Sequence, residues 1–330
     1  MNGPRGRRAG WVLLALVAAL AAAAPLIGPN DVAQQFPDRA YAPPVLPRLV
    51  DADGRWHAPF VHPLRLVDRL DRRYVEDRAT RVPLRWFSGG TLVSSGDPHV
   101  PWLPLGGDAL GRDVLARVLR GAQLSLGVGA VAVAGALCIG ALLGALAGFS
   151  GGRVDEALMR VADFVLVLPA IYVVLALRAS MPLVLTTAQV FWTVASVLAL
   201  AGWPYPARGV RALIAAEGRK DYAEAAKAAG AGRWRILLRH LLPATRGFLL
   251  VQATLLLPAF ILAEATLSFV GLGFPEPVPS WGVMLQEAAR VGAFDDAPWL
   301  LAPAAGIVTT VLAVHLAAGG VPKTRRSMPT

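Results

Sequence analysis

Long, almost uncharged apolar stretches recur along this chain of 330 residues, and they constrain its fold more than any other feature. Several of them approach the ~20 residues that a helix needs to cross the hydrocarbon core of a bilayer. Apolar residues make up 55% of the whole sequence. We therefore expect most of the chain to span a membrane instead of forming a soluble core.

Six spans are predicted, at about residues 11–27, 123–149, 161–178, 183–203, 247–270 and 299–319. The expected fold class is an all-α polytopic membrane protein with an external insertion between the first and second helices. The predicted parts are an N-terminal tail with the first helix, an extracytoplasmic loop or small subdomain, a core of five helices with a long loop at 204–246, and a C-terminal tail. They cover residues 1–28, 29–122, 123–320 and 321–330.

Lysine and arginine set the orientation, because short loops rich in these residues stay in the cytoplasm. The loop at 204–246 holds nine basic residues against three acidic ones, and basic residues also flank the first and last spans (Arg5, Arg7, Arg8, Lys323, Arg325, Arg326). We predict that this loop and both termini are cytoplasmic. Since the net charge of +10 is concentrated at these places, with no groove-reading module, we expect no nucleic-acid partner.

The first span has a second interpretation. A charged start, RGRRAG, precedes the apolar run WVLLALVAALAAAAPLIG, and this is also the pattern of a secretory signal peptide. Cleavage between Pro25 and Pro29 would leave five spans and an external start. N-terminal sequencing of the mature chain distinguishes the two.

Residues 29–122 carry turn signals such as Pro43-Pro44 and Gly89-Gly90. Between these turns, RWHAPFVHPLRLV and RVPLRWFSGGTLV alternate apolar and polar residues, which predicts short strands. A small folded subdomain and a disordered segment both fit this composition. The one cysteine, Cys138, lies in a predicted span, so no intrachain disulfide can form.

The stretch DYAEAAKAAGAGRWRILLRHLLP, residues 221–243, predicts a small-residue helix, a glycine break and a basic second helix. Alanines favour a helix and let another protein approach its backbone closely. Gly230 is expected to end the first helix in a left-handed conformation, and Lys220 is expected to pair with Glu224 one turn away. An ordinary surface helix-turn-helix is the alternative to a docking element.

This stretch resembles the EAA loop of bacterial ABC importer permeases, in which ATP hydrolysis drives solute import. The matching residues are Asp221, Glu224, Ala225, Ala226, Gly230, Leu242 and Pro243. Further segments resemble the dipeptide and oligopeptide permease subfamily in the expected order: LGGDALGRDVLARVLRGAQLSL at 105–126, GFSGGRVDEALMRVAD at 148–163, WPYPARGVR at 203–211 and ATLSFVGLGFPEPVPSWGVML at 265–285. The long first loop is similar to that of a branch with an enlarged external loop.

The resemblance implies a type I importer permease with partners in the bacterial inner membrane. Those partners are a second, homologous permease, two cytoplasmic ATPases that dock on residues 221–243, an extracytoplasmic solute-binding protein and membrane lipid. ATP and magnesium would bind to the ATPases, and no cofactor or metal to this chain. Peptides are the implied solutes, and nickel, oligosaccharides or opines are the alternatives.

Segment 105–126 is expected to begin with an amphipathic helix at the outer interface of the membrane, and a solvated lead-in helix is the alternative. Arg112, Asp113, Arg117 and Arg120 would form its polar side. Within the spans, a glycine at every fourth position predicts close helix packing or is a coincidence in a Gly- and Ala-rich chain; the residues are Gly140, Gly144 and Gly148.

Ionisable residues at membrane depth are candidates for function. Glu264 is expected to face the pathway, a partner helix or the outer interface, and Gln252 to hydrogen-bond between helices. A proton-coupled carrier that uses Glu264 and His315 is a different class of function, and a membrane scaffold is another. ATP dependence of uptake separates the carrier from the importer.

Catalytic signatures are absent from the sequence. It has no G-x-x-x-x-G-K-[ST] phosphate loop, no H-E-x-x-H and no G-x-S-x-G. We therefore predict that the chain is not an enzyme.

Overall fold

The structure is a computed structural model that describes residues 4–51, 54–69, 71–97, 99–169, 172–173, 175–176, 185–291 and 295–318. The chain divides into two compact units. One comprises Met1–Val12, Leu126–Glu264 and Val311–Thr330, and the other comprises Leu13–Ser125 and Ala265–Thr310. Both are described separately below.

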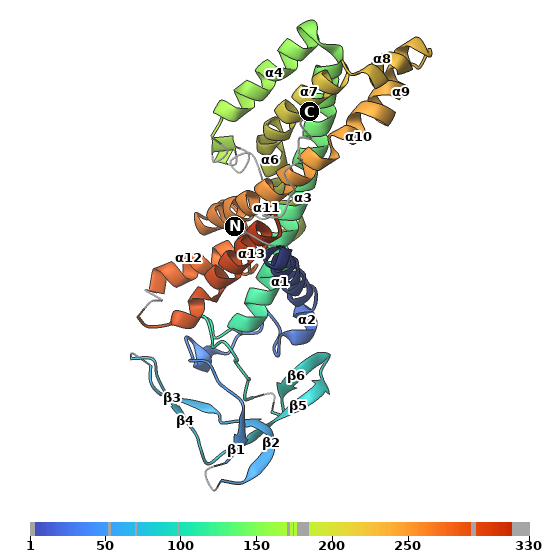
Figure 1. The fold of residues 1–330 in the computed structure, drawn as a ribbon. Helices are drawn as coiled ribbons and strands as arrows, with labels where there is room; N and C mark the ends of the chain where they lie inside the picture. Colours follow the sequence, from blue (N-terminus) through green and yellow to red (C-terminus); the bar gives the residue numbers. More distant parts are fainter. Residues whose placement is uncertain are drawn as a thin grey trace. The chain divides into compact units, whose positions relative to one another are not determined.

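The chain is mostly helical (Figure 1). Four helices belong in part to each unit: α1 (Pro4–Ala22), α3 (Val114–Ser150), α11 (Arg246–Phe269) and α13 (Ala302–Ala318). Other described helical segments of the first unit include α4 (Gly152–Val167), α6 (Thr187–Gly202), α7 (Pro204–Glu217), α8 (Asp221–Ala228), α9 (Arg233–Ile236), the π-helix η2 (Leu237–Leu241) and α10 (Leu242–Ala244). Those of the second unit are α2 (Ala24–Ile27), the 3-10 turns η1 (Pro37–Arg39) and η3 (Pro298–Leu301), and α12 (Trp281–Val291).

Three helices among the described residues are long and apolar enough to cross a membrane: α3, α11 and the helical run Pro298–Ala318. The pair α6 and α7, bent by 42°, makes a fourth if it counts as one broken span. These helices cover the predicted spans 123–149, 247–270 and 299–319 and most of 183–203. Part of the predicted span 161–178 and the tail 321–330 lie outside the described residues. The count of six spans stays a prediction.

Six strands occupy residues 48–95 of the second unit. A four-stranded antiparallel sheet has the order β1 (Arg48–Val50), β2 (Trp56–Val61), β5 (Val82–Ser88) and β6 (Thr91–Ser95). A separate two-stranded ribbon pairs β3 (Leu64–Asp68) with β4 (Arg73–Glu76). The two segments whose alternation predicts strands hold β2, β3, β5 and β6, so the prediction of strands is confirmed.

The β-rich segment has an apolar core of its own. Val61, Val82, Leu84 and Leu103 are buried there, together with Ala42, Val45 and Leu64. Val82 and Leu84 alternate with the exposed Pro83 and Arg85, as expected for a strand with one buried face. In the structure this segment contains strands around that core, and "all-α" is therefore too narrow a description of the fold.

Candidate functional site

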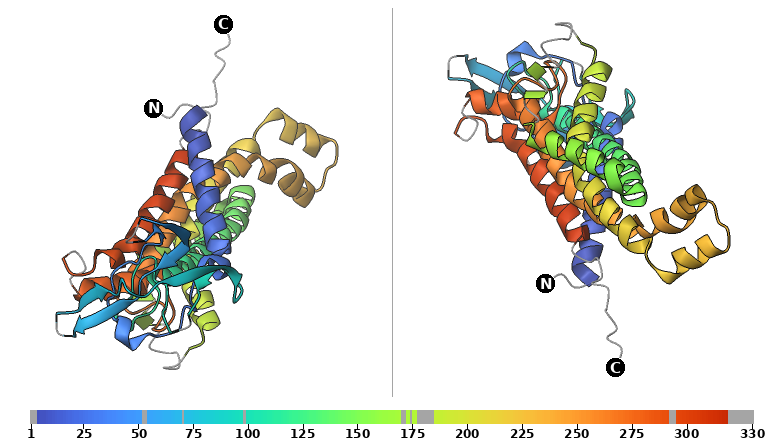
Figure 2. Two further views of the ribbon diagram at one scale, coloured as in Figure 1. Left: turned by 90° about the horizontal axis from the view of Figure 1, so that it is seen from below. Right: turned by 90° about the horizontal axis from the view of Figure 1, so that it is seen from above.

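The stretch 221–243 folds as a short helical hairpin of α8 and α9. In Figure 2 this yellow hairpin projects from the other helices of its unit. Ala223 is buried against the unit, whereas Asp221, Glu224 and Ala225 are exposed. The Trp234 side chain on α9 is 65% exposed. The hairpin thus presents carboxylates, small side chains and one large aromatic ring on an accessible surface.

Gly230 ends α8 as predicted. Its φ of 76° is left-handed, and the Gly230 N–H donates to Lys227 O at 3.0 Å while the Ala231 N–H donates to Ala226 O at 3.0 Å. These two bonds form a Schellman motif, which satisfies carbonyls at the helix end and favours glycine at this position. Gly232 lies two residues further on with φ −62°, where any residue is tolerated.

The predicted ion pair between Lys220 and Glu224 is wrong. Lys220 Nζ instead lies 2.6 Å from Glu217 Oε1, and Tyr222 Oη donates to Glu217 Oε2 at 2.8 Å. Partial burial and this carboxylate raise the pKa of Tyr222 to about 12. The exposed Glu224 side chain forms no ion pair or hydrogen bond with the residues that the structure describes, so it is available to a partner.

An apolar base anchors the hairpin. Ala223, Ile236, Leu237 and Leu241 pack with Ala145 at the end of α3 and with Val210 and Ile214 of α7. Pro243 carries no N–H to continue an α-helix, and the five residues before Leu242 form the π-helix η2, after which α10 contains Leu242 and Pro243. The hairpin therefore packs directly on the ends of α3 and α7.

Gly140, Gly144 and Gly148 lie on one face of α3 where α7 approaches closely. A Cβ at Gly144 would meet the backbone of Ala207, and one at Gly148 would meet the backbone of Arg211. At Gly140 it would meet the ring of Pro206. In the structure the three glycines therefore lie on a packing face, the kind of close approach that small residues allow between membrane helices.

The polar residues expected at membrane depth do not form one site. Glu264 on α11 has no exposed surface, so it does not reach an interface with solvent. His315 on α13 is exposed. Gln252 is partly buried, and its side chain makes no hydrogen bond with the described residues. The predicted interhelical bond of Gln252 is thus not formed within the described part of the chain.

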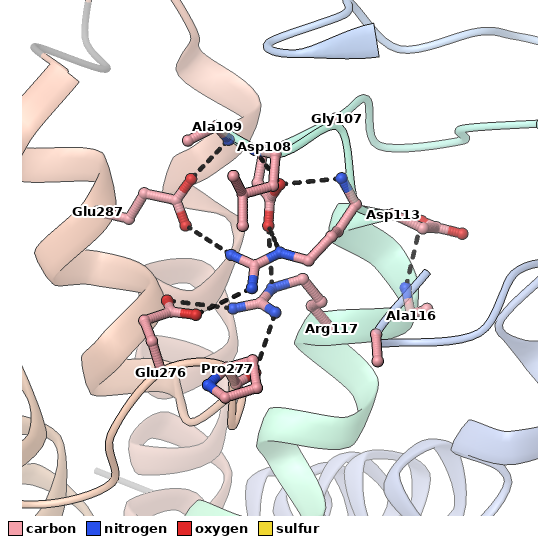
Figure 3. A network of polar contacts seen from close by, with 12 residues as sticks. Gly107, Asp108, Ala109, Asp113, Ala116, Arg117, Glu276, Pro277 and Glu287 are labelled. Atoms are coloured by element: carbon pink, nitrogen blue, oxygen red, sulfur yellow. Dashed lines mark hydrogen bonds and ion pairs between the residues drawn. The ribbon is translucent and has the colours of Figure 1, made fainter. Parts of the chain in front are cut away.

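The second unit contains a buried charged cluster that sequence reasoning missed (Figure 3). Arg112 and Arg117 are 2% and 0% exposed, and Asp108 between them is 1% exposed. Asp108 Oδ2 lies 2.6 Å from Arg112 Nε and 3.2 Å from Arg117 Nε. Two buried guanidinium groups therefore share one buried carboxylate.

Two glutamates complete the cluster from the other side. Glu276 Oε2 lies 2.9 Å from Arg112 Nη1, and Glu287 on α12 contributes one carboxylate oxygen 3.8 Å from Arg112 Nη2. The second oxygen of Glu287 accepts a bond of 2.7 Å from the Ala109 N–H. The cluster joins residues 108–117 to 276–287, two segments about 160 residues apart in sequence, as the Arg117–Pro277 contact records.

Burial governs the electrostatics of the cluster. Burial raises the pKa of Glu287, and the nearby Asp108 raises it further. For Arg112, burial lowers the pKa but the carboxylates of Asp108 and Glu276 outweigh it, so that the pKa is raised. The guanidinium of Arg112 stays charged, as a buried arginine does when acidic groups surround it.

Asp113 directly precedes α3 and is almost fully buried. Its Oδ1 accepts the N–H groups of Leu115 and Ala116 at 2.9 and 3.3 Å, and its Oδ2 accepts a bond of 2.9 Å from Asn30 Nδ2. This is an aspartate helix cap. Burial raises the pKa of Asp113 to about 6, although these hydrogen bonds oppose the shift.

Two features of the predicted interfacial helix are wrong: the exposure of most of its charged residues and the residue at which the helix begins. α3 begins at Val114 and runs without a break to Ser150. Only Arg120 of the four charged residues faces solvent. The signal that would have found the cluster is the presence of Glu276 in the otherwise uncharged segment 265–285, since buried charges require partners.

The comparisons with known proteins agree with this architecture. A family described as "Binding-protein-dependent transport system inner membrane component" matches residues 140–323. The oligopeptide transport system permease protein OppC of Bacillus subtilis (strain 168) is 35% identical over 236 residues, 71% of this chain and 75% of the relative. The di/tripeptide transport system permease protein DppC of Pseudomonas aeruginosa (strain UCBPP-PA14) is 36% identical over 241 residues, 73% and 74% of the two chains. The dipeptide transport system permease protein DppC of Bacillus subtilis (strain 168) is 40% identical over 182 residues, 55% of each.

Long apolar helices and these matches define a multi-pass membrane permease. The chain belongs to the family of binding-protein-dependent transport system inner membrane components. Within that family it is a permease subunit of an ABC importer, of the dipeptide and oligopeptide permease type.

Proposed function

We propose that this permease imports peptides and that the α8–α9 hairpin is the surface on which a cytoplasmic ATPase docks. The accessible Glu224 and Trp234, above a base that packs on α3 and α7, carry the proposal. Small side chains along α8 allow a partner to approach the backbone closely. The site is Asp221, Glu224, Ala225, Ala226 and Gly230, with Leu242 and Pro243 at its base.

The proposed complex has four further components. A second, homologous permease pairs with this chain to enclose the pathway, two ATPase subunits bind below it, and an extracytoplasmic binding protein delivers the solute. ATP and magnesium bind to the ATPases, which carry out the hydrolysis, and this chain holds no cofactor. The names of the relatives, which concern oligopeptides, dipeptides and tripeptides, support peptides as the solutes. Nickel, oligosaccharides and opines are the alternatives.

The proposed topology has six spans in a bacterial inner membrane, with both termini and loop 204–246 in the cytoplasm and the β-rich segment outside. The excess of basic residues in that loop supports this orientation. The β-rich segment, with its own apolar core, then forms the external subdomain between the first and second spans.

The mechanism follows from the packing of the hairpin. Closure of the ATPases on ATP would move α8 and α9 as a rigid body. Because their base packs on Ala145, Val210 and Ile214, and because the glycine face brings α3 and α7 together, the displacement would pass into these two helices. Alternating access of the pathway would result from their movement.

Affinity purification of the tagged chain in mild detergent, followed by mass spectrometry, tests the docking surface. We expect a second permease and ATPase subunits to be recovered with the unmodified chain. Gly230→Asp should lose the ATPases and abolish ATP-dependent uptake of trialanine, because the substitution strains the Schellman motif. The matched control is Gly232→Asp, which adds the same charge at the N-cap of α9, where aspartate is favoured.

Equal recovery of ATPases with both variants would contradict the docking surface. Recovery of the chain alone, with uptake that does not require ATP, would instead favour a proton-coupled carrier. No uptake at all would favour a membrane scaffold.

A further inference from the structure

The second unit contains a pocket of about 760 Å³ between the β3–β4 turn and the segment that follows α12. This volume lies in the range of sites for small organic ligands. Three aromatic side chains line it, Tyr41, Tyr74 and Trp299. All of its lining residues belong to the same compact unit. We call it the aromatic pocket.

Two residues of this pocket have a backbone conformation that side-chain-bearing residues rarely adopt. Tyr41 has φ 55° and Arg72 has φ 50°. The guanidinium of Arg72 lies over the Tyr41 ring, 4.1 Å from its centroid. Left-handed bulky residues persist only where the surroundings hold them, and they occur preferentially at ligand sites. Both strained residues meet in one contact, at the pocket wall.

The charged cluster described above supports two of the aromatic walls. The Tyr41 N–H donates to Asp108 O at 2.9 Å, and Trp299 Nε1 donates to Gly107 O at 3.0 Å. Asp108 is in turn fixed by Arg112 and Arg117. Tyr74 Oη donates to Ala40 O at 2.7 Å, beside Tyr41. The walls are therefore held by hydrogen bonds to backbone carbonyls of the cluster and its neighbours.

The pocket carries exposed charges of both signs. Asp71 and Arg72 contribute from the β3–β4 turn, and Arg290 and Asp296 contribute from α12 and the chain after it. None of these four side chains forms an ion pair with another residue in the described part of the chain, and Arg72 lies over the Tyr41 ring. Uncompensated arginines and aspartates in one pocket suit a ligand that itself carries both charges.

We propose that the aromatic pocket is a binding site for a small zwitterionic peptide. Arg72 and Arg290 are available to its carboxylate, Asp71 and Asp296 to its ammonium group, and the three rings pack against its backbone and side chains. A ligand with a single charge would engage only one of these two pairs of side chains, so a ligand with both charges is bound more tightly. The inference rests on the proposed function, since it assigns a second contact point to the imported solute.

Direct binding tests the site. Radiolabelled trialanine is titrated against the assembled importer in lipid nanodiscs without the binding protein. Arg290→Gln and Asp296→Asn should each weaken binding about ten-fold, as expected when one charge-assisted hydrogen bond is lost. Arg69→Gln is the matched control, because Arg69 lies beside the same turn but is 82% exposed and pairs with Asp38. N-acetyl-trialanine, which lacks the ammonium group, should bind the unmodified importer and Asp296→Asn equally weakly.

Absence of saturable binding to the unmodified importer would overturn the inference, as would equal affinities in all variants. The same samples are assayed for ATP-dependent uptake with the binding protein present. Normal uptake without pocket binding refutes this inference alone. Loss of ATP-dependent uptake from the unmodified importer refutes the proposed function itself.

Discussion

The α8–α9 hairpin and the Arg112 cluster use charged residues in opposite ways. On the hairpin, the carboxylate of Glu224 is exposed and without a partner among the described residues, above an apolar base. In the cluster, Arg112, Arg117 and Asp108 are buried and paired with one another. An exposed charge costs little and remains available to another protein, whereas a buried charge is stable only with its partners in place. The hairpin is thus suited to binding and the cluster to fixing positions.

The largest expected effect of a single substitution is in the cluster. Asp108→Asn leaves two buried guanidinium groups with a neutral neighbour, and breaking a buried pair typically costs 3–5 kcal/mol, so we expect a loss of about that size here. Thermal unfolding of the purified importer in detergent measures it. Asp38→Asn is the control, since Asp38 and its partner Arg69 are 76% and 82% exposed and such pairs contribute about 0–1 kcal/mol. Similar losses of stability in both variants would contradict the difference between the buried cluster and the exposed ion pair.

A second prediction concerns the pH dependence of stability that the buried Asp113 contributes. The pKa of Asp113 is about 6 in the folded chain against an ordinary value of 3.8. Between these two values the folded chain holds a proton that the unfolded chain has released, so Asp113 makes stability fall as pH rises through this window. The loss is on the order of 2–3 kcal/mol. Asp113→Asn, which cannot ionise, should remove this slope in thermal unfolding at pH 4 to 7.

Asp77 provides a control of the opposite sign. The Thr80 hydroxyl and nearby backbone N–H groups lower its pKa, so its contribution is present above the ordinary pKa and is lost as pH falls. Asp77→Asn should therefore leave the slope assigned to Asp113 unchanged. If Asp113→Asn retained the full slope, another group would have to be responsible.

The smallest predicted effect concerns the hairpin alone. Gly230→Ala places a Cβ in a left-handed conformation at a cost of about 1–2 kcal/mol. A Cβ at Gly232 meets nothing within 4 Å and has no such strain. Hydrogen exchange followed by mass spectrometry should show faster exchange in α8 for Gly230→Ala and no change for Gly232→Ala. Faster exchange in both variants would show that the left-handed conformation of Gly230 is not what stabilises the end of α8.

The difference between the α8–α9 hairpin and the Arg112 cluster also explains which features the sequence predicts. Gly230 obeys a local rule, because a glycine after an alanine-rich helix predicts a left-handed end. The strands in 55–93 follow local alternation in the same way. The cluster depends on Asp108 meeting Glu276 and Glu287, and no local pattern records which residues are brought together over such a separation. The local pattern accordingly predicts Arg112 and Arg117 on the polar side of an interfacial helix, although both are buried.

The pairing of Lys220 is also difficult to predict, because two carboxylates lie at similar distances from it in the sequence. Lys220 has a carboxylate at Glu217 and another at Glu224, each about one helical turn away. Helix spacing alone favours Glu224, but α8 begins only at Asp221, and the turn before it brings Glu217 closer. Helix boundaries, which sequence patterns define poorly, therefore decided the pairing.

The length of α3 has a consequence for the arginines near its start. At 1.5 Å per residue, its 37 residues extend for about 55 Å, whereas the hydrocarbon core of a bilayer is about 30 Å thick. About 17 residues of this helix must therefore lie beyond the hydrocarbon, or the helix must tilt strongly. Arg117 and Arg120 fall within its first two turns. The span can thus keep both guanidinium groups out of the lipid tails while its glycine-bearing half crosses them.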